Sequence, residues 1–560
     1  PPETLAFLTY RPAVSPTPTE AAMKKSFLLV LLISTVVKLW LAAFFPFTGD
    51  EAYFYQWGAH LDWGGYYDHP PMAGWWLWAL QHISSHTLVL RSPAVLLWVA
   101  VVFGMMNLYG HLFPLHAERR WLLGSLFLVL PFTWAFNLIT TDTPLVLFLF
   151  FSGYAFIRAE LENQWRWYAA SGVLLGLALL SKYFAGLLAI TYAIYLLPRK
   201  GGIKRLLLVA VCALPFMLLN MMWNATHCWN NILFNLINRN QGAHFSISQV
   251  FLYLVMLLYL VTPWVLIALW RHSKPGSKVR HENALQGQDD TPPTMNADRN
   301  SGGKEDFDVA SKTNVSNKLF LTANTGNMVV ATLFTIPFGL FLLLSFYKQI
   351  GLHWLLAFVP FVFLFVAAYL PNDVLYRLSR WNLWFGAPHL LLLLALMYLP
   401  IEVFKPYRIQ PDIVLHRDGK DVVRVLKQDM ASNAVLMTRS YSQSSLLAFH
   451  AKAYVPVFGF GSFHARFDDA ITNFRELDGK NIRIASTSEI DVNSLRAYFG
   501  QVKVQERVIN GARFWIADGE GFRFEPYRAE VLTSVAERYY KAPSWLPAYG
   551  CRFLEMYEFI

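Results

Sequence analysis

The feature that most constrains this chain is a succession of apolar segments of roughly membrane-spanning length. A spanning helix needs about 20 consecutive apolar residues, and 55% of the 560 residues are hydrophobic while only 15% are charged. A soluble fold does not accommodate so much apolar sequence. The sequence therefore predicts a polytopic α-helical membrane protein with about eleven transmembrane helices. The predicted spans are residues 27–47, 88–110, 121–139, 143–157, 167–181, 183–198, 206–223, 248–270, 327–346, 353–370 and 382–400.

Positive charge is distributed unevenly over the loops between these segments. If the first span begins in the cytoplasm, sixteen Lys and Arg residues fall in the loops on the cytoplasmic side, and few fall in the opposite loops. This asymmetry follows the positive-inside rule. Membrane orientation thus accounts for the net charge of +10, and we expect no nucleic-acid partner.

Three parts of the chain differ in composition from the apolar segments. Residues 1–22 are rich in Pro, Thr and Glu, and we expect a disordered extension there. Residues 272–326 are polar and lack periodicity, which indicates a flexible cytoplasmic linker within a membrane domain over residues 23–400. Residues 401–560 alternate β-like runs with helical stretches, which predicts a small extracytoplasmic α/β domain.

The cysteine content is low. Three cysteines cannot form a disulfide framework, and Cys212 lies inside an apolar segment. A single bridge between Cys228 and Cys551 is compatible with the sequence, although no pattern supports it.

The stretch TGDEAYFYQWGAHLDWGGYYDHPPMAGWWLW, residues 48–78, follows the first predicted span and carries four carboxylates but no Lys or Arg. A carboxylate at the membrane surface needs water, a partner or a substrate nearby. Asp50 and Glu51 adjoin the end of the span and precede Tyr53, a residue type that stacks on sugars and settles at interfaces. We therefore predict an acid-lined cavity that faces outward at the lipid surface. Other segments predicted on this side are 140–144, 181–183, 224–247, 347–354 and 401–560.

Five short motifs occur in a fixed order along residues 25 to about 400: GDEAY at 49–53, YDHPPM at 67–72, TDTPL at 141–145, SKY at 181–183 and HW at 353–354. This series resembles the bacterial branch of the dolichyl-phosphate-mannose protein mannosyltransferase-like superfamily. These are family 39 glycosyltransferases of the GT-C fold, related to the aminoarabinose transferases. The resemblance implies transfer of a sugar from a polyprenyl-phosphate carrier to an acceptor, with inversion at the anomeric carbon.

The resemblance also implies roles for individual residues. Asp50 would be the catalytic base, and Asp142 occupies a second acidic position of the family, with a helix N-cap as the alternative role. Asp68 and His69 match a site beside the leaving phosphate, where together they could hold a divalent metal ion. No other cofactor is implied.

The remaining candidates are substrate-binding residues. Glu51 and Tyr53 would shape the site, and several basic groups could neutralise the phosphate charge or, alternatively, snorkel to the membrane interface. These basic candidates are Arg91, Lys182, Arg239, Lys348 and His353.

The location and the acceptor follow from the same resemblance. We expect a multi-pass protein of the bacterial inner (plasma) membrane, with its active site and C-terminal domain facing the periplasm among membrane lipids. The expected partners are a polyprenyl-phosphate sugar donor and a lipid or glycan acceptor, such as lipid A or lipopolysaccharide. The aminoarabinose transferases usually have Lys where His69 stands, so the donor sugar stays open.

Three alternatives remain. Protein O-mannosylation is less favoured because Met72, Ala73 and Gly74 follow the His-Pro-Pro motif where the eukaryotic enzymes have Leu-Gly-Lys. An ion-coupled transporter would have acids near the middle of several spans and repeated halves, and the sequence shows neither. A catalytically silent membrane scaffold with a binding domain at residues 401–560 is the third.

Overall fold

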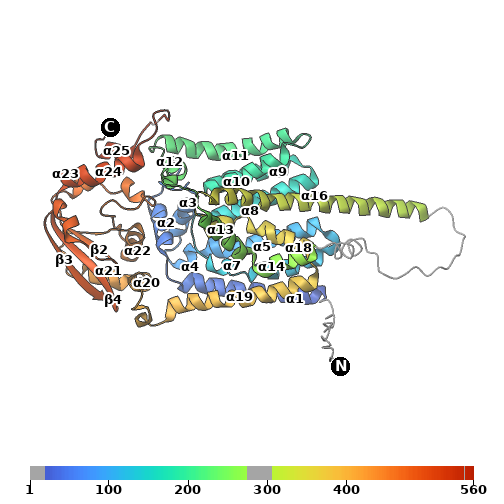
Figure 1. Ribbon diagram of the computed structural model, residues 1–560, viewed down its shortest axis with the longest axis horizontal. Helices are drawn as coiled ribbons and strands as arrows, with labels where there is room; N and C mark the ends of the chain where they lie inside the picture. The colour runs from blue at the N-terminus through green and yellow to red at the C-terminus, as the bar shows by residue number, and fades with distance from the viewer. Residues whose placement is uncertain (1–18, 274–304, 548, 560) are drawn as a thin grey trace, which may run out of the picture.

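The computed structural model describes residues 19–273, 305–547 and 549–559, and over residues 305–324 it describes the backbone only. A long helical bundle carries a small sheet at one end (Figure 1). Most of the expected N-terminal extension, residues 1–18, and most of the expected linker, residues 274–304, lie outside the described residues.

The bundle is built from helices that coincide with the predicted apolar segments. Some of these segments form one helix, and others form two shorter ones. The helices are α1 (Glu20–Phe44), α4 (Thr87–Leu90), α5 (Ser92–Leu112), α6 (Arg120–Leu128), α7 (Phe132–Ala135), α8 (Asp142–Glu162), α9 (Trp165–Leu179), α10 (Gly186–Leu196), α11 (Gly202–Ala225), α13 (Ile247–Val261), α14 (Pro263–His272), α16 (Glu305–Ser345), α17 (Leu352–Leu355), α18 (Val359–Tyr369) and α19 (Asn372–Tyr398).

The chain is a multi-pass membrane protein. Six helices of the described residues are long and apolar enough to cross a membrane, and the pair α13 and α14, bent by 80°, would make a seventh. Other predicted spans are shorter as helices. The segment 121–139, for example, breaks between α6 and α7 at Pro131, which has no N–H to continue a helix. The number of membrane crossings, about eleven, therefore stays a prediction.

Helix α16 departs from the expected linker. Residues 305–326 belong to this helix rather than to a segment without regular structure, and α16 extends beyond the bundle at the end opposite the sheet (Figure 1). Adding residues to a helix that is already nucleated costs little. The prediction of an irregular linker is therefore wrong for residues 305–326, where a lack of hydrophobic periodicity does not exclude a helix.

The membrane bundle has an aromatic interior and an apolar exterior. Fully buried rings from α1, α5, α6, α8 and α18 pack together in one core; they include Phe27, Trp98, Phe127, Phe150 and Phe363. The opposite side of α1 is exposed although it is apolar, because lipid is its solvent. The exposed residues there include Leu28, Leu29, Leu32, Ile33 and Val36.

The C-terminal region contains a four-stranded mixed sheet with the order β1-β2-β4-β3. Strands β1 (Val435–Thr438) and β2 (Ile482–Ser486) are parallel, and β4 (Ala512–Phe522) pairs antiparallel with both β2 and β3 (Phe499–Ile509). The β-like runs expected from the sequence are residues 433–438, 453–460, 481–486, 502–509 and 512–517. Four of these five runs form the strands. The fifth, at 453–460, makes only an isolated bridge to β1, since Pro456 lacks an N–H and Gly459 has φ +92°.

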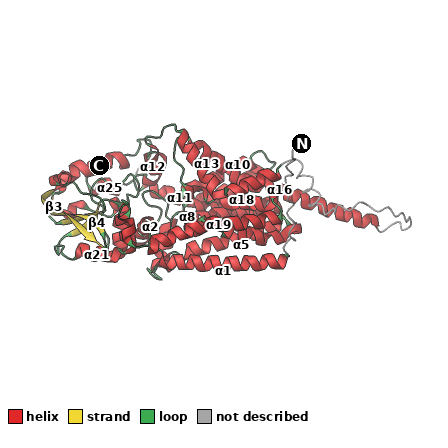
Figure 2. Ribbon diagram, turned by 60° about the horizontal axis from the view of Figure 1, so that its bottom comes forward, coloured by secondary structure: helices red, strands yellow, loops and turns green. Residues whose placement is uncertain are grey.

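Three short helices lie at the end of the bundle next to the sheet, which is called its outer end below. They are α2 (Gly49–Ala59), α3 (Met72–Gln81) and α12 (Asn230–Leu236). Helix α2 packs against α22 (Tyr441–Ala451), which follows β1, so α22 lies between the bundle and the sheet (Figure 1). Figure 2 shows the strands at the same end of the molecule as α2. The packing is close at Gly49, where an added Cβ would lie 2.8 Å from the Cβ of Ser442. The C-terminal region is therefore seated directly on the helix that carries Asp50.

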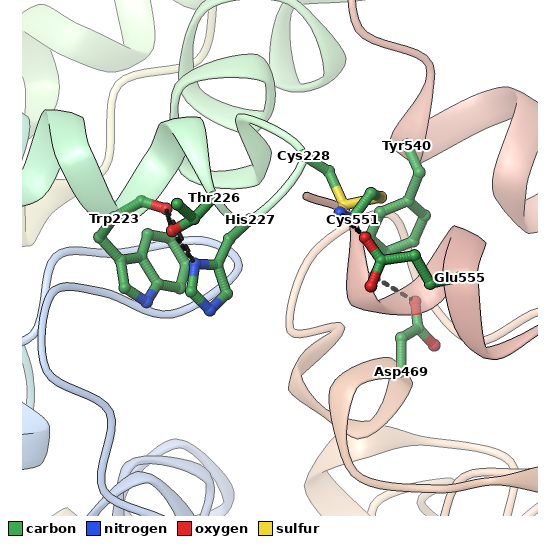
Figure 3. The surroundings of a disulfide bond; sticks show 8 residues. All are labelled: Trp223, Thr226, His227, Cys228, Asp469, Tyr540, Cys551 and Glu555. Atoms are coloured by element: carbon green, nitrogen blue, oxygen red, sulfur yellow. Dashed lines mark hydrogen bonds between the residues drawn. A yellow bond between two sulfur atoms is a disulfide. The ribbon is translucent and has the colours of Figure 1, made fainter. Parts of the chain in front are cut away.

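A disulfide forms a second link between the two parts. Cys228, after α11, is bonded to Cys551, which precedes α25 (Arg552–Met556), across a sequence separation of 323 (Figure 3). The N–H of Cys228 also donates to the carbonyl of Gly550 at 3.1 Å, and the N–H of Tyr549 to that of Ala225 at 2.8 Å. The C-terminal tail is thus fastened to the outer end of α11.

We predict that loss of this disulfide destabilises the protein without unfolding the membrane bundle. Cross-links that close long loops contribute about 2–4 kcal/mol, so Cys228→Ser should lower the melting temperature in detergent and speed proteolysis of the C-terminal tail. Cys212→Ser, which removes the free thiol on α11, is the control. An unchanged melting temperature for Cys228→Ser would contradict the prediction.

Candidate active site

A cavity of about 290 Å³ opens where the outer ends of the helices meet the C-terminal region. Seven residues proposed from the sequence line it, so the predicted convergence of distant motifs is observed. They are Asp50, Tyr53, Asp68, His69, Asp142, Lys182 and His353. The rest of the lining is largely apolar and includes Leu97, Trp98, Phe136, Leu138, Val146 and Leu356. The cavity therefore presents both titratable groups and an apolar wall.

Asp50 lies in the first turn of α2 and is exposed. Thr48 and Glu51 form a capping box that fixes the start of this helix. Because the positive end of the helix dipole favours an anion in the first turn, this position suits an ionised carboxylate. Asp50 Oδ1 accepts a hydrogen bond of 2.9 Å from the hydroxyl of Tyr441.

Asp68 is buried in the loop between α2 and α3. Its Oδ1 accepts a hydrogen bond of 3.0 Å from the Tyr53 hydroxyl. Burial, with a further contribution from the Asp50 carboxylate, raises the pKa of Asp68 to about 7, although Tyr53 and the Arg239 charge oppose the shift. A substantial fraction of Asp68 is therefore protonated at neutral pH and able to donate a hydrogen bond.

Two of the three histidines that line the cavity, His69 and His353, are held neutral. Burial and the charges of Lys182 and Arg239 lower the pKa of His69 well below its usual value. Burial also lowers the pKa of His353 to about 4, although Asp142 opposes the shift. Each ring can therefore donate one N–H without adding a formal charge.

Asp142, at the start of α8, forms an ion pair with Lys182. The Lys182 Nζ lies 2.9 Å and 3.1 Å from the two carboxylate oxygens, and only 5% of the Lys182 side chain is exposed. The Nε2 of His353 lies 3.9 Å from Asp142 Oδ2. Thr141, not Asp142, occupies the N-cap position, so the structure favours the site interpretation of Asp142 over the capping interpretation.

Two lining residues from the C-terminal region were missed at the sequence level. Tyr441 and His464 both contribute to the cavity, and their rings meet edge to face at 5.1 Å. Neither belongs to a motif of the membrane domain, and they lie 391 and 414 residues after Asp50. The only available signal was the prediction that the C-terminal region faces the same side as the motifs.

Comparisons with known proteins bear on the family and the fold of the chain. The family model for dolichyl-phosphate-mannose-protein mannosyltransferase matches residues 68–229. The predicted family resemblance is confirmed over this segment. No curated protein matches the chain.

The fold matches crystal structures of ArnT from Cupriavidus metallidurans at 12% identity. The apo form gives a TM-score of 0.52 and covers 88% of this chain and 98% of ArnT. The form bound to undecaprenyl phosphate gives 0.53 and covers 88% of this chain and 97% of ArnT. The chain thus has the GT-C fold seen in ArnT.

Glu51 and Arg91 do not line the cavity, which corrects their assignment as substrate-binding residues. The Glu51 carboxylate accepts two hydrogen bonds from Arg91, at 2.6 Å and 2.7 Å, and a third from the backbone N–H of Ile139 at 3.0 Å. Arg91 also donates to the carbonyls of Phe45 and Pro46, just after α1. Both side chains are fully buried. Glu51 and Arg91 find these hydrogen-bond partners within the protein, so the pair connects α1, α2 and the start of α5.

Arg239 and Lys348 lie beside the cavity without lining it. The Arg239 guanidinium stacks on Trp354, 4.6 Å from the ring centroid, and its charge acts on Asp68 and Asp142. Lys348 donates to Asn240 Oδ1 at 2.7 Å. Burial and the charge of Arg239 lower the pKa of Lys348 to about 8. Arg239 retains an electrostatic role at the site, whereas Lys348 holds the adjacent loop.

Among the described residues, no third metal ligand accompanies Asp68 and His69 at the suggested metal site. Within residues 19–273, 305–547 and 549–559, no group of three or more His, Cys, Asp and Glu side chains is arranged to hold a metal ion. Asp68 is instead hydrogen-bonded to Tyr53.

We predict that breaking the Glu51–Arg91 pair destabilises the fold. Removing one partner leaves a buried charge unpaired, which costs about 3–5 kcal/mol. Arg91→Leu and Glu51→Leu should therefore each lower the melting temperature in detergent strongly. Arg377→Leu, which breaks an exposed pair with Asp373, should have a much smaller effect. Equal effects of the buried and exposed substitutions would refute the assignment.

Proposed function

We propose that this protein is an inverting glycosyltransferase that moves a sugar from a polyprenyl-phosphate carrier to a hydroxyl acceptor. The observation that carries the proposal is the composition of one cavity. It combines the exposed carboxylate of Asp50, hydrogen-bond donors at Lys182 and His69, and an apolar wall. An amphiphilic donor with an anionic phosphate and a lipid chain matches all three features.

The chemistry follows from these groups. Asp50 accepts the proton of the acceptor hydroxyl while that oxygen forms a bond to the anomeric carbon. The bond between the anomeric carbon and the phosphate oxygen breaks on the opposite face, and the polyprenyl phosphate leaves with the electron pair. Lys182, with the neutral donors Asp68 and His69, stabilises the charge that develops on the phosphate. Attack opposite the leaving group inverts the configuration.

The apolar wall supplies a place for the start of the lipid chain. Leu97 and Trp98 come from α5, and Val146 from α8, so this side of the cavity is continuous with the membrane bundle. ArnT was crystallised with undecaprenyl phosphate, which supports a carrier of this class. No nucleotide-binding motif is required by such a donor.

The proposed location is the bacterial inner membrane, with the cavity on the periplasmic side. The positive-inside distribution of Lys and Arg supports this orientation. The Cys228–Cys551 disulfide supports it independently, because disulfides persist in oxidising compartments. A surface lipid or glycan, such as lipid A or lipopolysaccharide, is the proposed acceptor, since such hydroxyls are reached from that side.

The placement of the acids argues against the transporter alternative. Asp50 and Asp142 lie in the first turns of α2 and α8, and Asp68 lies in a loop. A transporter would place its coupling acids near the middle of its spans. Acids at the outer helix ends suit chemistry at the membrane surface.

We predict that Asp50→Asn lowers the transfer rate by about 100-fold to 10,000-fold, the range for loss of a general base. The assay follows release of polyprenyl phosphate from a panel of radiolabelled polyprenyl-phosphate sugars, with membrane lipid extract as the acceptor. Asp491→Asn, an exposed acid whose cap to Asn493 an amide can retain, is the control. Full activity of Asp50→Asn would overturn the proposed mechanism.

We also predict that Asp68 acts in its protonated form. Its pKa of about 7 means that the donated proton is present below this pH and lost above it. The wild-type rate should therefore fall as pH rises from 6 to 9, whereas Asp68→Asn, which keeps an N–H donor at every pH, should stay flatter over this range. Parallel pH–rate profiles for the two proteins would exclude the protonated form as the active one.

A further inference from the structure

The C-terminal region contributes a direct hydrogen bond to the proposed base. Tyr441 begins α22, and its hydroxyl donates to Asp50 Oδ1 at 2.9 Å across 391 residues of sequence. Among the residues that the structure describes, Asp50 Oδ2 has no hydrogen-bond partner. One carboxylate oxygen is therefore fixed, and the other is available.

The position of Tyr441 is set by the turn between β1 and α22. Thr438, the last residue of β1, donates from its hydroxyl to the carbonyl of Ser440 at 2.9 Å. The Ser440 and Ser442 hydroxyls are 3.0 Å apart and share a hydrogen bond. Ser442 in turn touches Gly49, next to Asp50, where no larger residue fits without displacement. The two helix starts are therefore held in register.

The ring of Tyr441 is clamped as well. It meets Tyr53 edge to face at 5.3 Å and His464 edge to face at 5.1 Å. Burial and the Asp50 carboxylate raise the pKa of Tyr441 far above its usual value, so the hydroxyl keeps its proton and remains a donor. These contacts hold the donor in place before substrate arrives.

We propose that Tyr441 is a positioning residue for Asp50, through which the C-terminal region completes the active site. Its hydrogen bond to Oδ1 fixes the orientation of the carboxylate and turns Oδ2 toward the proton of the acceptor. This inference rests on the proposed function for its catalytic consequence. The hydrogen bond itself can be tested without turnover.

The first test is kinetic. Tyr441→Phe keeps the ring and removes only the hydroxyl, so the maximal rate should fall about tenfold, the effect of one hydrogen bond to a charged group, with the donor KM unchanged. Tyr540→Phe is the matched control, since its hydroxyl donates to Asp469 at 2.7 Å outside the cavity.

The second test measures the contact without turnover. In a double-mutant cycle on melting temperature, Tyr441→Phe should lower the melting temperature less in an Asp50→Ala background than in wild type, because the hydroxyl has lost its acceptor. Tyr540→Phe should have the same effect in both backgrounds, since its hydroxyl donates to Asp469.

The outcomes separate the two proposals. A smaller effect of Tyr441→Phe on the melting temperature in the Asp50→Ala background, together with a slowed Tyr441→Phe enzyme, supports the inference. Equal effects in both backgrounds and equal rates for Tyr441→Phe and Tyr540→Phe overturn it and leave the proposed function intact. Unequal effects with an active Asp50→Asn variant establish the contact but overturn both the catalytic role of Tyr441 and the assignment of Asp50 as base. Comparable melting temperatures of the two Phe variants exclude misfolding as the cause.

Discussion

The buried pair of Glu51 and Arg91 is the interaction on which the geometry of the site depends. Arg91 satisfies carbonyls left open at the end of α1 while it binds Glu51 in two places, and Glu51 also caps α2 through Thr48. One charged pair thereby orients the span, the outer helix and the acid next to it in sequence. The two adjacent acids therefore have different roles, because Glu51 fixes the start of α2 and Asp50 stays exposed.

The cavity separates three acids into three environments. Asp50 is exposed at a helix start, Asp68 is buried with a phenol, and Asp142 is paired with Lys182. The first is open to the cavity, the second is partly protonated because burial raises its pKa to about 7, and the third orients a cation. For the proposed phosphate donor, this arrangement limits the repulsion from acidic side chains, because Asp142 is paired with Lys182 and Asp68 is partly protonated.

Sequence patterns predicted the membrane bundle and much of the site because both depend on local signals. Apolar runs identify helices, and the motifs around Asp50, Asp68 and Asp142 mark loops that topology brings to one side. Glu51 and Arg91 were predicted to bind substrate, whereas they form a buried structural pair. Neither burial nor pairing across 40 residues can be recognised from the neighbouring sequence. Tyr441 was missed, and the Cys228–Cys551 bridge was only one possibility compatible with the sequence, because each depends on a three-dimensional distance between segments more than 300 residues apart.

The link between residues 228 and 551 limits how far the C-terminal region can move from the membrane bundle. Tyr441 and His464, which line the cavity, lie within the stretch of chain that this bond closes. If the contacts between α2 and α22 break during a local opening, the bond keeps the two parts close together at a high effective concentration. The hydrogen bond between Tyr441 and Asp50 therefore re-forms after each opening without a search through solution.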